Sequence, residues 1–344
     1  MSSAFRVGLT HDFLSPEGKL VYQDIGLDLL DAAPAVQRIF LDAHPSPLRA
    51  RDVEGLDAVI SLAPAWTPET LTGAGRLVGV VRFGVGYDMV DVAACTAADV
   101  AVAITAGAVN RSMAEAILTW MLALSHRVLQ KDRLVRDSRW AQKAHFMGCE
   151  LRGRTLGIVG LGGIGRTLVE LVRGLGMNPP LAFDPLGNPS EAAALGVSLV
   201  PLEELLRRSD FVSINCPLNA RTRGLIGRDQ LSLMKGDAFL INTARGGIVD
   251  EQALVDALRT GRIAGAGVDV FETEPADGRH PLASLENVIL APHAIGWTHE
   301  LFREIGRAAC TAVLSLSRGE VPSGIVNPEV LGRAGFLEKL RSRV

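Results

Sequence analysis

Three polar side chains, Arg245, Glu274 and His293, each follow a short apolar run that is typical of a buried strand. A guanidinium can bind a carboxylate through two parallel hydrogen bonds. An imidazole exchanges protons near neutral pH, and a nearby carboxylate favours its protonated form. Ligands of open parallel sheets bind outside the carboxyl ends of the strands, so we expect these three side chains to converge on one crevice. The set predicts proton transfer on a small substrate that carries a carboxylate.

A glycine-rich loop, Gly160-Leu161-Gly162-Gly163-Ile164-Gly165, joins an expected strand to an expected helix. In this context Gly160 permits a tight turn, Gly162 lets a pyrophosphate approach the backbone, and Gly165 lets helix and strand pack closely. The amides and the dipole of the helix N-terminus favour the anion. The loop therefore predicts a dinucleotide-binding site.

Asp184 ends the next expected strand, where an acid can accept hydrogen bonds from the adenosine ribose hydroxyls. A carboxylate there repels a 2′-phosphate, and the following Pro185-Leu186 supplies no arginine to bind one. We therefore expect NAD rather than NADP as the cofactor. Hydride transfer to or from a 2-oxo acid needs a cation for the carboxylate, an acid–base group and a partner that orients it, which are the three side chains above.

The composition limits the other classes of protein. A chain of 344 residues with 48% hydrophobic content predicts two domains. The formal net charge of −3 is mixed along the chain, so we expect neither a nucleic-acid nor a membrane partner. The N-terminus does not resemble a signal peptide and no apolar run is long enough to span a bilayer, which favours a cytoplasmic location. The four cysteines are far apart, so we expect no metal site and no disulfide framework.

Apolar runs alternate with helix-like stretches along the whole chain, which predicts an α/β fold with mostly parallel sheets. The expected strands are 5–9, 58–62, 77–81, 155–159, 181–183, 211–214, 238–241, 267–270 and 288–290. Ser112 and Glu115 have the spacing of a capping box and predict the start of a long helix. Residues 127–145 follow as an extended polar arm, and residues 300–316 are expected to return as a helix to the first domain.

These features together resemble the D-isomer-specific 2-hydroxyacid dehydrogenases, the family that contains phosphoglycerate, glycerate and D-lactate dehydrogenases. The resemblance runs from about Val78 to Val326. It is carried by the glycine loop and by the segments Arg82-Phe83-Gly84-Val85-Gly86-Tyr87-Asp88, Cys216-Pro217-Leu218, Asn242-Thr243-Ala244-Arg245-Gly246-Gly247, Asp269-Val270-Phe271-Glu272-Thr273-Glu274-Pro275 and Pro292-His293.

The resemblance implies a fold and an activity. We expect a Rossmann-type doubly wound parallel sheet for the cofactor in residues 108–296, and a smaller flavodoxin-like α/β substrate domain in residues 1–107 and 297–344. The expected activity is the NAD-dependent interconversion of a small D-2-hydroxy acid and its 2-oxo acid. The two domains would hinge around the cleft.

The resemblance also implies roles for single residues. His293 would be the acid–base group, Glu274 its partner, and Arg245 the group that grips the carboxylate and polarises the carbonyl. Val85 and Gly86 would offer backbone amides to the substrate carboxylate. The further residues expected around the cofactor are Val85, Gly163, Ile164, Cys216, Pro217, Thr222, Thr243, Ala244, Arg245, Asp269, His293 and Gly296, with Asp269 near the nicotinamide carboxamide.

Some positions depart from the family pattern. Ile295 and Trp297 follow His293 where members usually show His-x-Gly-x-x-Thr, so Trp297 is expected in the pocket wall. Trp66 lies in a loop that is expected to cover the substrate. The segment Leu62-Ala63-Pro64-Ala65-Trp66 lacks the arginine typical of members that act on phosphorylated acids, which favours a non-phosphorylated substrate, although Arg139 or Lys143 on the arm could contact a phosphate.

The arm after Arg127 resembles the dimer contact of the family, so we expect a homodimer. The chain stops at Val344 after a short polar tail, and we expect no appended regulatory domain. Three other functions stay open at this stage. They are an NAD(H)-sensing, corepressor-like binding protein, a phosphoglycerate dehydrogenase, and a formate or phosphite dehydrogenase on the same fold.

Overall fold

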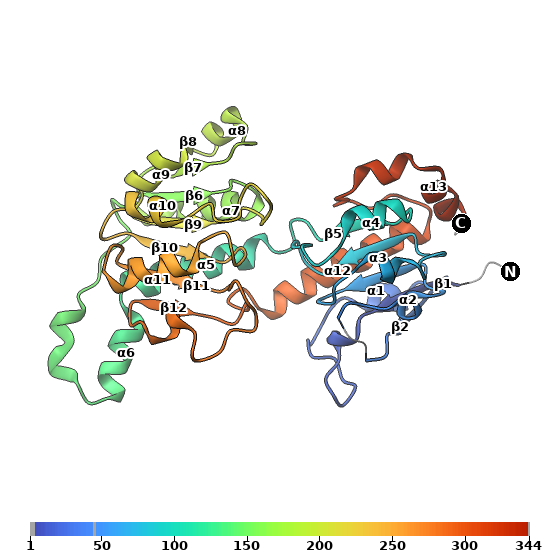
Figure 1. Cartoon of the computed structure of the whole chain (residues 1–344), viewed down its shortest axis with the longest axis horizontal. Coiled ribbons are helices and arrows are strands. Elements are labelled where there is room, and N and C mark those ends of the chain that lie inside the picture. The colour runs from blue at the N-terminus through green and yellow to red at the C-terminus, as the bar shows by residue number, and fades with distance from the viewer. Residues whose placement is uncertain (1–3, 44–45, 343–344) are drawn as a thin grey trace. The chain divides into compact units, whose positions relative to one another are not determined.

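The structure is a computed structural model that describes residues 4–43 and 46–342. The chain divides into two compact units (Figure 1). Unit 1 comprises Met1–Val109 and Trp297–Val344, and unit 2 comprises Asn110–Gly296. The divisions therefore lie after residues 109 and 296, against the expected 107 and 296.

Unit 1 is built on a five-stranded parallel sheet in the order β2-β1-β3-β4-β5. This order is that of flavodoxin-like folds and confirms the expected class. The strands are β1 (Phe5–Leu9), β2 (Val36–Phe40), β3 (Ala58–Ser61), β4 (Gly79–Arg82) and β5 (Ala101–Ile104).

Helices cover both faces of this sheet. The core on one face joins α2, α3 and α4 to the central strands, whereas α12 packs on β3, β4 and α1. The long α12 is the helix that was expected to return from the end of the chain. The helical elements of unit 1 are η1 (His11–Phe13), α1 (Asp28–Asp31), α2 (Ala50–Val53), α3 (Pro68–Leu71), α4 (Val92–Ala97), α12 (His299–Ser317), η5 (Pro328–Gly332) and α13 (Ala334–Arg341).

Unit 2 is built on a seven-stranded parallel sheet in the order β12-β11-β10-β9-β6-β7-β8. The strands are β6 (Leu156–Val159), β7 (Leu181–Phe183), β8 (Ser198–Leu199), β9 (Phe211–Ile214), β10 (Phe239–Asn242), β11 (Gly265–Val268) and β12 (Val288–Leu290). The chain runs outward from β6 to β8 and then returns to the other side of β6. This is the doubly wound Rossmann arrangement, with its switch point between β6 and β9, and it confirms the predicted fold.

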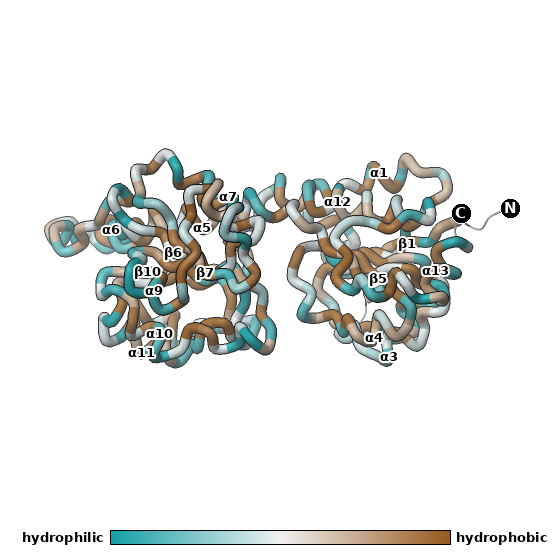
Figure 2. The backbone as a smooth tube through the Cα atoms, turned by 90° about the horizontal axis from the view of Figure 1, so that it is seen from above, coloured by the Kyte–Doolittle hydropathy of each residue, from teal (hydrophilic) through white to brown (hydrophobic). Residues whose placement is uncertain are grey.

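Two apolar cores lie on opposite faces of the sheet of unit 2. One joins α5, α7 and α8 to the strands, and the other joins α9, α10 and α11 to them. In Figure 2 the hydrophobic segments follow strands such as β6 and β5, while hydrophilic segments gather on outer loops. The helical elements of unit 2 are α5 (Asn110–Ser125), α6 (Val128–Arg136), η2 (Trp140–Phe146), α7 (Gly163–Val172), η3 (Arg173–Leu175), α8 (Pro189–Ala194), α9 (Leu202–Arg208), α10 (Arg228–Leu233), α11 (Glu251–Arg259) and η4 (Pro281–Ser284).

The start of α5 corrects one prediction. Ser112 was expected to cap this helix together with Glu115, but the helix already begins at Asn110. Ser112 is therefore inside the first turn, and Glu115 instead pairs with Arg111 one turn before it. The helix therefore begins three residues before residue 113, where a cap at Ser112 would have placed its start.

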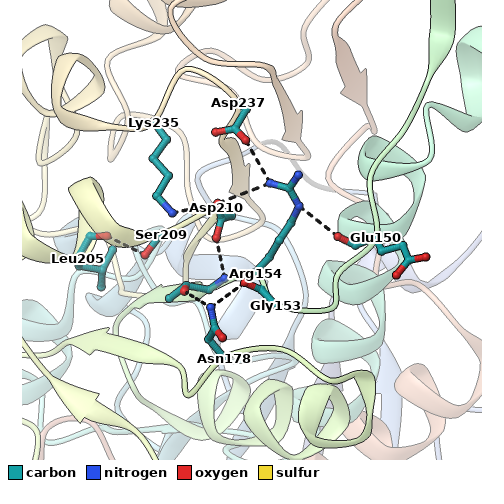
Figure 3. Close-up of polar contacts among 10 residues, drawn as sticks. Glu150, Gly153, Arg154, Asn178, Leu205, Ser209, Asp210, Lys235 and Asp237 are labelled. Carbon is teal, nitrogen blue, oxygen red and sulfur yellow. Dashed lines mark hydrogen bonds and ion pairs between the residues drawn. The ribbon is translucent and has the colours of Figure 1, made fainter.

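Both sheets use a buried aspartate at their amino ends. In unit 1, Asp57 accepts hydrogen bonds from the Arg6 amide at 2.8 Å and from the Arg76 guanidinium at 2.9 Å. In unit 2, Asp210 accepts from the Thr155 amide at 2.7 Å and from Lys235 Nζ at 3.0 Å (Figure 3). Each aspartate precedes the strand next to the first strand of its sheet, so it fixes two strand starts at the end away from the predicted crevice.

Among residues 4–43 and 46–342, no helix combines the length and the apolar character that a membrane span requires.

Candidate active site

His293 and Glu274 form a hydrogen-bonded pair at the carboxyl ends of β12 and β11. His293 Nδ1 lies 2.8 Å from Glu274 Oε2, and the side chains are 44% and 37% exposed. His293 has a φ of 55°, a left-handed conformation that a non-glycine residue rarely adopts. Strain of this kind concentrates at functional sites, and here the imidazole is both accessible and held in one orientation.

The second carboxylate oxygen of Glu274 is also fixed. Its Oε1 accepts the backbone amide of Phe271 at 3.0 Å, so the loop after β11 folds back on its own glutamate. Both oxygens of the carboxylate therefore have a hydrogen-bond partner. A carboxylate held in this way accepts the Nδ1 proton and leaves Nε2 of His293 for a substrate oxygen.

Asp269, at the end of β11, folds the segment that follows His293. Its Oδ1 accepts the amides of Ala294 and Ile295 at 2.8 and 3.1 Å, and its carbonyl accepts the amide of His293 at 2.8 Å. Burial raises the pKa of Asp269, and these two amides and the charge of His293 partly offset that rise. Asp269, which was expected beside the cofactor, therefore also shapes the backbone around His293.

Arg245 follows β10, the strand next to β11. The side chain of Asn242 fixes this turn by accepting the Ala244 amide at 3.1 Å and donating to the Arg245 carbonyl at 3.0 Å. The adjacent Gly246 packs so closely on the backbone of Phe271 and Glu272 that a Cβ atom would overlap it. The arginine turn is therefore in direct contact with the segment that leads to Glu274.

The glycine loop lies between β6 and α7, beside the switch point of the sheet. Gly160 has a φ of 96°, and a Cβ there would lie 2.8 Å from the amide nitrogen of Cys216 on the loop after β9. A Cβ on Gly165 would lie 2.8 Å from the Gly160 carbonyl oxygen, whereas one on Gly162 would have no heavy atom within 4 Å. The loop thus packs tightly at Gly160 and Gly165 and is open at Gly162, directly before the helix that begins at Gly163. This shape fits the pyrophosphate of a dinucleotide.

Asp184 lies at the end of β7 and borders this loop. Its Oδ2 accepts the Leu161 amide at 2.9 Å and its Oδ1 accepts the Leu186 amide at 2.9 Å. A carboxylate has about four acceptor positions, so two remain for hydroxyl donors. Asp184 therefore both anchors the glycine loop and can accept ribose hydroxyls.

The other predicted cofactor residues of unit 2 also lie at carboxyl ends of strands. Burial raises the pKa of Cys216 to about 11, so this side chain is a neutral thiol at neutral pH. Thr222 closes the loop after β9 by donating to the Pro217 carbonyl at 2.6 Å and accepting the Asn219 amide at 2.8 Å. Thr243 is buried at the end of β10, next to the half-buried Ala244.

The first turn of α5 contacts two of these loops, and these contacts were not predicted from the sequence. The side chain of Asn110 lies against Gly163, and the sulfur of Met113 lies against Gly296. A Cβ atom at either glycine would overlap these side chains, which would then have to move. Sequence spacing gives no signal for the contacts, because α5 is far from both loops along the chain.

The remaining predicted residues belong to unit 1. Val85 and Gly86 are partly exposed after β4, and Trp297 is 54% exposed beside Tyr22 and Phe302. The expectation for Trp66 is corrected, because its side chain is only 1% exposed and its indole donates to Ser61 Oγ at 3.0 Å. Trp66 is a core residue of unit 1, since its apolar ring fills the space beneath α3 and α4, and it offers no surface to a substrate.

A pocket of about 610 Å³ opens beside the pair in unit 2. Glu274, His293 and His280 lie in its wall together with Phe271, Pro275 and Leu290. The pair therefore borders a cavity with largely apolar walls, in which an imidazole–carboxylate contact is screened less than in bulk water.

Comparison with known proteins gives consistent matches. Residues 118–294 match the profile of the NAD binding domain of the D-isomer specific 2-hydroxyacid dehydrogenases. The chain is 37% identical over 331 residues to a glyoxylate reductase of Korarchaeum cryptofilum, which covers 95% of this chain and 97% of that protein. It is 37% identical over 259 residues to a D-3-phosphoglycerate dehydrogenase of Archaeoglobus fulgidus, but this match covers 75% of the chain and only 49% of that protein.

A solved structure extends the comparison. The D-lactate dehydrogenase of Aquifex aeolicus, crystallised with NAD and lactic acid, superposes with a TM-score of 0.80 at 25% identity. The match covers 93% of this chain and 98% of that chain.

Proposed function

The chain belongs to the D-isomer specific 2-hydroxyacid dehydrogenase family, and we propose that it interconverts small D-2-hydroxy acids and 2-oxo acids with NAD. The single observation that carries the proposal is the 2.8 Å contact between His293 Nδ1 and Glu274 Oε2 beside a Rossmann-type cofactor site. The contact fits a reaction in which one proton moves together with one hydride. Bound NAD supplies the nicotinamide carbon that accepts or donates that hydride.

His293 is the proposed acid–base group. In the direction of reduction, the protonated imidazole donates its Nε2 proton to the oxygen of the substrate carbonyl. In oxidation, the neutral imidazole takes the proton of the hydroxyl group. Glu274 supports both directions, because its charge stabilises the imidazolium and its position fixes the ring.

Arg245 is the proposed carboxylate-binding residue. Its planar guanidinium can hold the substrate carboxylate with two bonds and polarise the adjacent carbonyl, which an ammonium does less well. Val85 and Gly86 are proposed to add backbone amides, and the half-exposed Trp297 is proposed to contact the substituent on the substrate. A loop at 62–66 without arginine supports a non-phosphorylated acid.

The cofactor is proposed to bind across the switch point of the sheet of unit 2. Gly160, Gly162, Gly163, Ile164 and Gly165 would hold the pyrophosphate, and Asp184 the adenosine ribose. The nicotinamide end would lie among the turns after β9, β10, β11 and β12. The proposed contacts there are Cys216, Pro217, Thr222, Thr243, Ala244, Arg245, Asp269, His293 and Gly296, with Val85 from unit 1.

An activity panel tests this function. Purified protein with NADH is offered glyoxylate, hydroxypyruvate, pyruvate and bulkier 2-oxo acids, and the loss of NADH absorbance is followed. In the reverse direction the protein receives NAD with 3-phosphoglycerate, formate or phosphite. Reduction of a non-phosphorylated 2-oxo acid is the expected result. Measurable NADH binding with no turnover of any acid would instead support an NAD(H)-sensing protein.

We further propose that the protein is a cytoplasmic homodimer that associates through α6 and η2. Val135 in α6 is 59% exposed, Trp140 in η2 is 64% exposed and Met147, directly after η2, is 75% exposed. Such exposure is unusual for large apolar side chains at a surface in contact with water. The mass of the wild type and of W140E, measured by light scattering after gel filtration, tests this assembly. A monomeric wild type would contradict it.

A further inference from the structure

The side chain of Glu251, in the first turn of α11, contacts both ends of the loop that carries Glu274. This loop, residues 271–280, leaves β11 and ends at η4. Glu251 Oε1 accepts the backbone amide of Glu272 at 2.6 Å, near the start of the loop. Glu251 Oε2 lies 3.1 Å from Nε2 of His280, at its end. One carboxylate therefore joins two points that enclose Glu274.

The contact at the start of the loop is reciprocal. Glu272 Oε1 accepts the backbone amide of Glu251 at 3.3 Å. The side-chain carboxylate of each glutamate therefore accepts the backbone amide of the other. Glu251 is not needed to cap its own helix, because Asp250 does so by accepting the Ala253 amide at 2.8 Å. The side chain of Glu251 is thus directed to the loop rather than to α11.

The contact at the end of the loop has a defined direction. His280 Nδ1 accepts the Leu282 amide at 3.3 Å, so in the neutral ring the proton lies on Nε2 and is donated to Glu251. The imidazole also packs edge-on against Phe271, whose amide binds Glu274 Oε1. The His280 and Glu251 side chains are 18% and 19% exposed, so this pair is shielded from water far more than the pair at His293.

We propose that Glu251 is a positioning residue that holds the loop 271–280 at both ends and thereby keeps the Glu274 carboxylate against His293. This inference rests on the proposed function, since it assigns Glu251 a role in the same proton transfer. Glu251 does not touch the reacting atoms. It acts through the Phe271 and Glu272 backbone, to which Glu274 is bonded, and small displacements of an acid–base group lower the rate steeply.

The first experiment compares E251A and E251Q with Q252A in the full-length protein. Gln252 is the matched control, because it is the next residue of α11 and its exposed side chain bonds to Asp256 on the same helix. We expect kcat for the best 2-oxo acid to fall about 10- to 100-fold in E251A, with the Kd for NADH within about twofold of wild type. E251Q should be intermediate, because a glutamine has one oxygen for the Glu272 amide and none for His280. Q252A should match wild type.

Amide hydrogen–deuterium exchange gives a readout that does not depend on activity. In E251A the peptides that cover residues 271–280 should exchange faster, while those of β9 and β10 should not change. If E251A does not fold, the same exchange measurement is made on E251Q and compared with wild type. Wild-type kcat together with wild-type exchange in E251A would overturn the inference.

A double variant tests whether Glu251 acts through Glu274. In the E274Q background the added E251A substitution should lower kcat less than about twofold, since the carboxylate it positions has been neutralised. If E251A lowered kcat in the E274Q background by the same factor as in the wild type, Glu251 would act elsewhere and the inference would be overturned. If the wild type reduced no 2-oxo acid, the proposed function and the positioning role would both fail, while the exchange data would still report whether Glu251 clamps the loop.

Discussion

Glu274 holds His293 through a 2.8 Å contact between Oε2 and Nδ1, while its other oxygen is bonded to the amide of Phe271. The glutamate is therefore fixed from one side and fixes the imidazole on the other. This arrangement determines which ring nitrogen faces the substrate, and it couples the acid–base group to the backbone of a loop.

Arg245→Lys keeps the positive charge but removes the forked guanidinium. We expect KM for the 2-oxo acid to rise at least about tenfold, because an ammonium cannot make two parallel bonds to the carboxylate. The Kd for NADH should change little. Steady-state kinetics measure KM for the 2-oxo acid, and fluorescence titration measures Kd for NADH. The control is R221K, which lies in the exposed loop after β9. A KM equal to that of the wild type would remove Arg245 from the substrate site.

Asp184→Ala tests the cofactor site. The variant loses acceptors for ribose hydroxyls and also releases the amides of Leu161 and Leu186. A hydrogen bond to a charged group contributes about 1.5–3 kcal/mol, so KM for NADH should rise about tenfold or more. D184N retains the size but not the charge, and it should narrow the preference for NADH over NADPH. Unchanged KM values for both cofactors in D184A would contradict the assignment.

Asp210→Ala should destabilise unit 2 without a direct effect on the chemistry. Asp210 is nearly buried and accepts from the Thr155 amide and Lys235 (Figure 3). Its removal leaves these donors unpaired, which costs about 3 kcal/mol in the free energy of unfolding. D237A is the matched control, because Asp237 pairs with Arg154 in the same cluster but is largely exposed, so its loss should cost less than about 1 kcal/mol. Urea unfolding measures the free energy of unfolding of both variants. Equal losses in D210A and D237A would contradict the prediction.

The pH dependence of stability tests the environment of Asp269. Burial raises the pKa of this carboxyl above its ordinary value of 3.8, so the folded state binds the proton more tightly than the unfolded chain does. The resulting stability is present at low pH and is lost as the pH rises through the raised pKa. The difference in unfolding free energy between wild type and D269N should therefore decrease as the pH rises through this range.

Asp132 provides the control with the opposite sign. Its hydrogen bond to the Arg136 guanidinium lowers its pKa, so any stability it adds is lost as the pH falls. The difference between wild type and D132N should increase with pH. Parallel slopes for D269N and D132N would contradict the account of Asp269.

Several strands could be predicted from short runs of mainly apolar residues. The strands β1, β7, β9 and β12 have the expected bounds, because mainly apolar residues mark them. The edge strands β2, β5 and β8 were missed. The partly exposed residues of β2 and β8 form no apolar run, whereas β5 was overlooked although its residues are apolar and mostly buried. The strand β11 begins at Gly265 rather than at the expected 267. Its first residues, Gly265 and Ala266, are small and gave no clear apolar signal.

The site was predictable only where side chains follow strands directly. Arg245, Glu274 and His293 could be placed at one edge of a sheet because parallel strands bring their carboxyl ends together. Trp66 was misjudged, since a loop position in sequence does not reveal that the ring turns into the core. Asn110 and Glu251 were missed, because their contacts with the glycine loop and with the loop at Glu274 arise only from tertiary packing.

The most direct test of the central claim is kcat for 2-oxo acid reduction by H293Q at saturating NADH. General acid catalysis contributes about 10²- to 10⁴-fold, and glutamine cannot donate a mobile proton. We therefore expect kcat to fall by about 10³-fold while the Kd for NADH stays near that of the wild type. A variant that keeps kcat within about twofold of the wild type would show that the proton comes from another group, and the role assigned to the His293–Glu274 pair would be wrong.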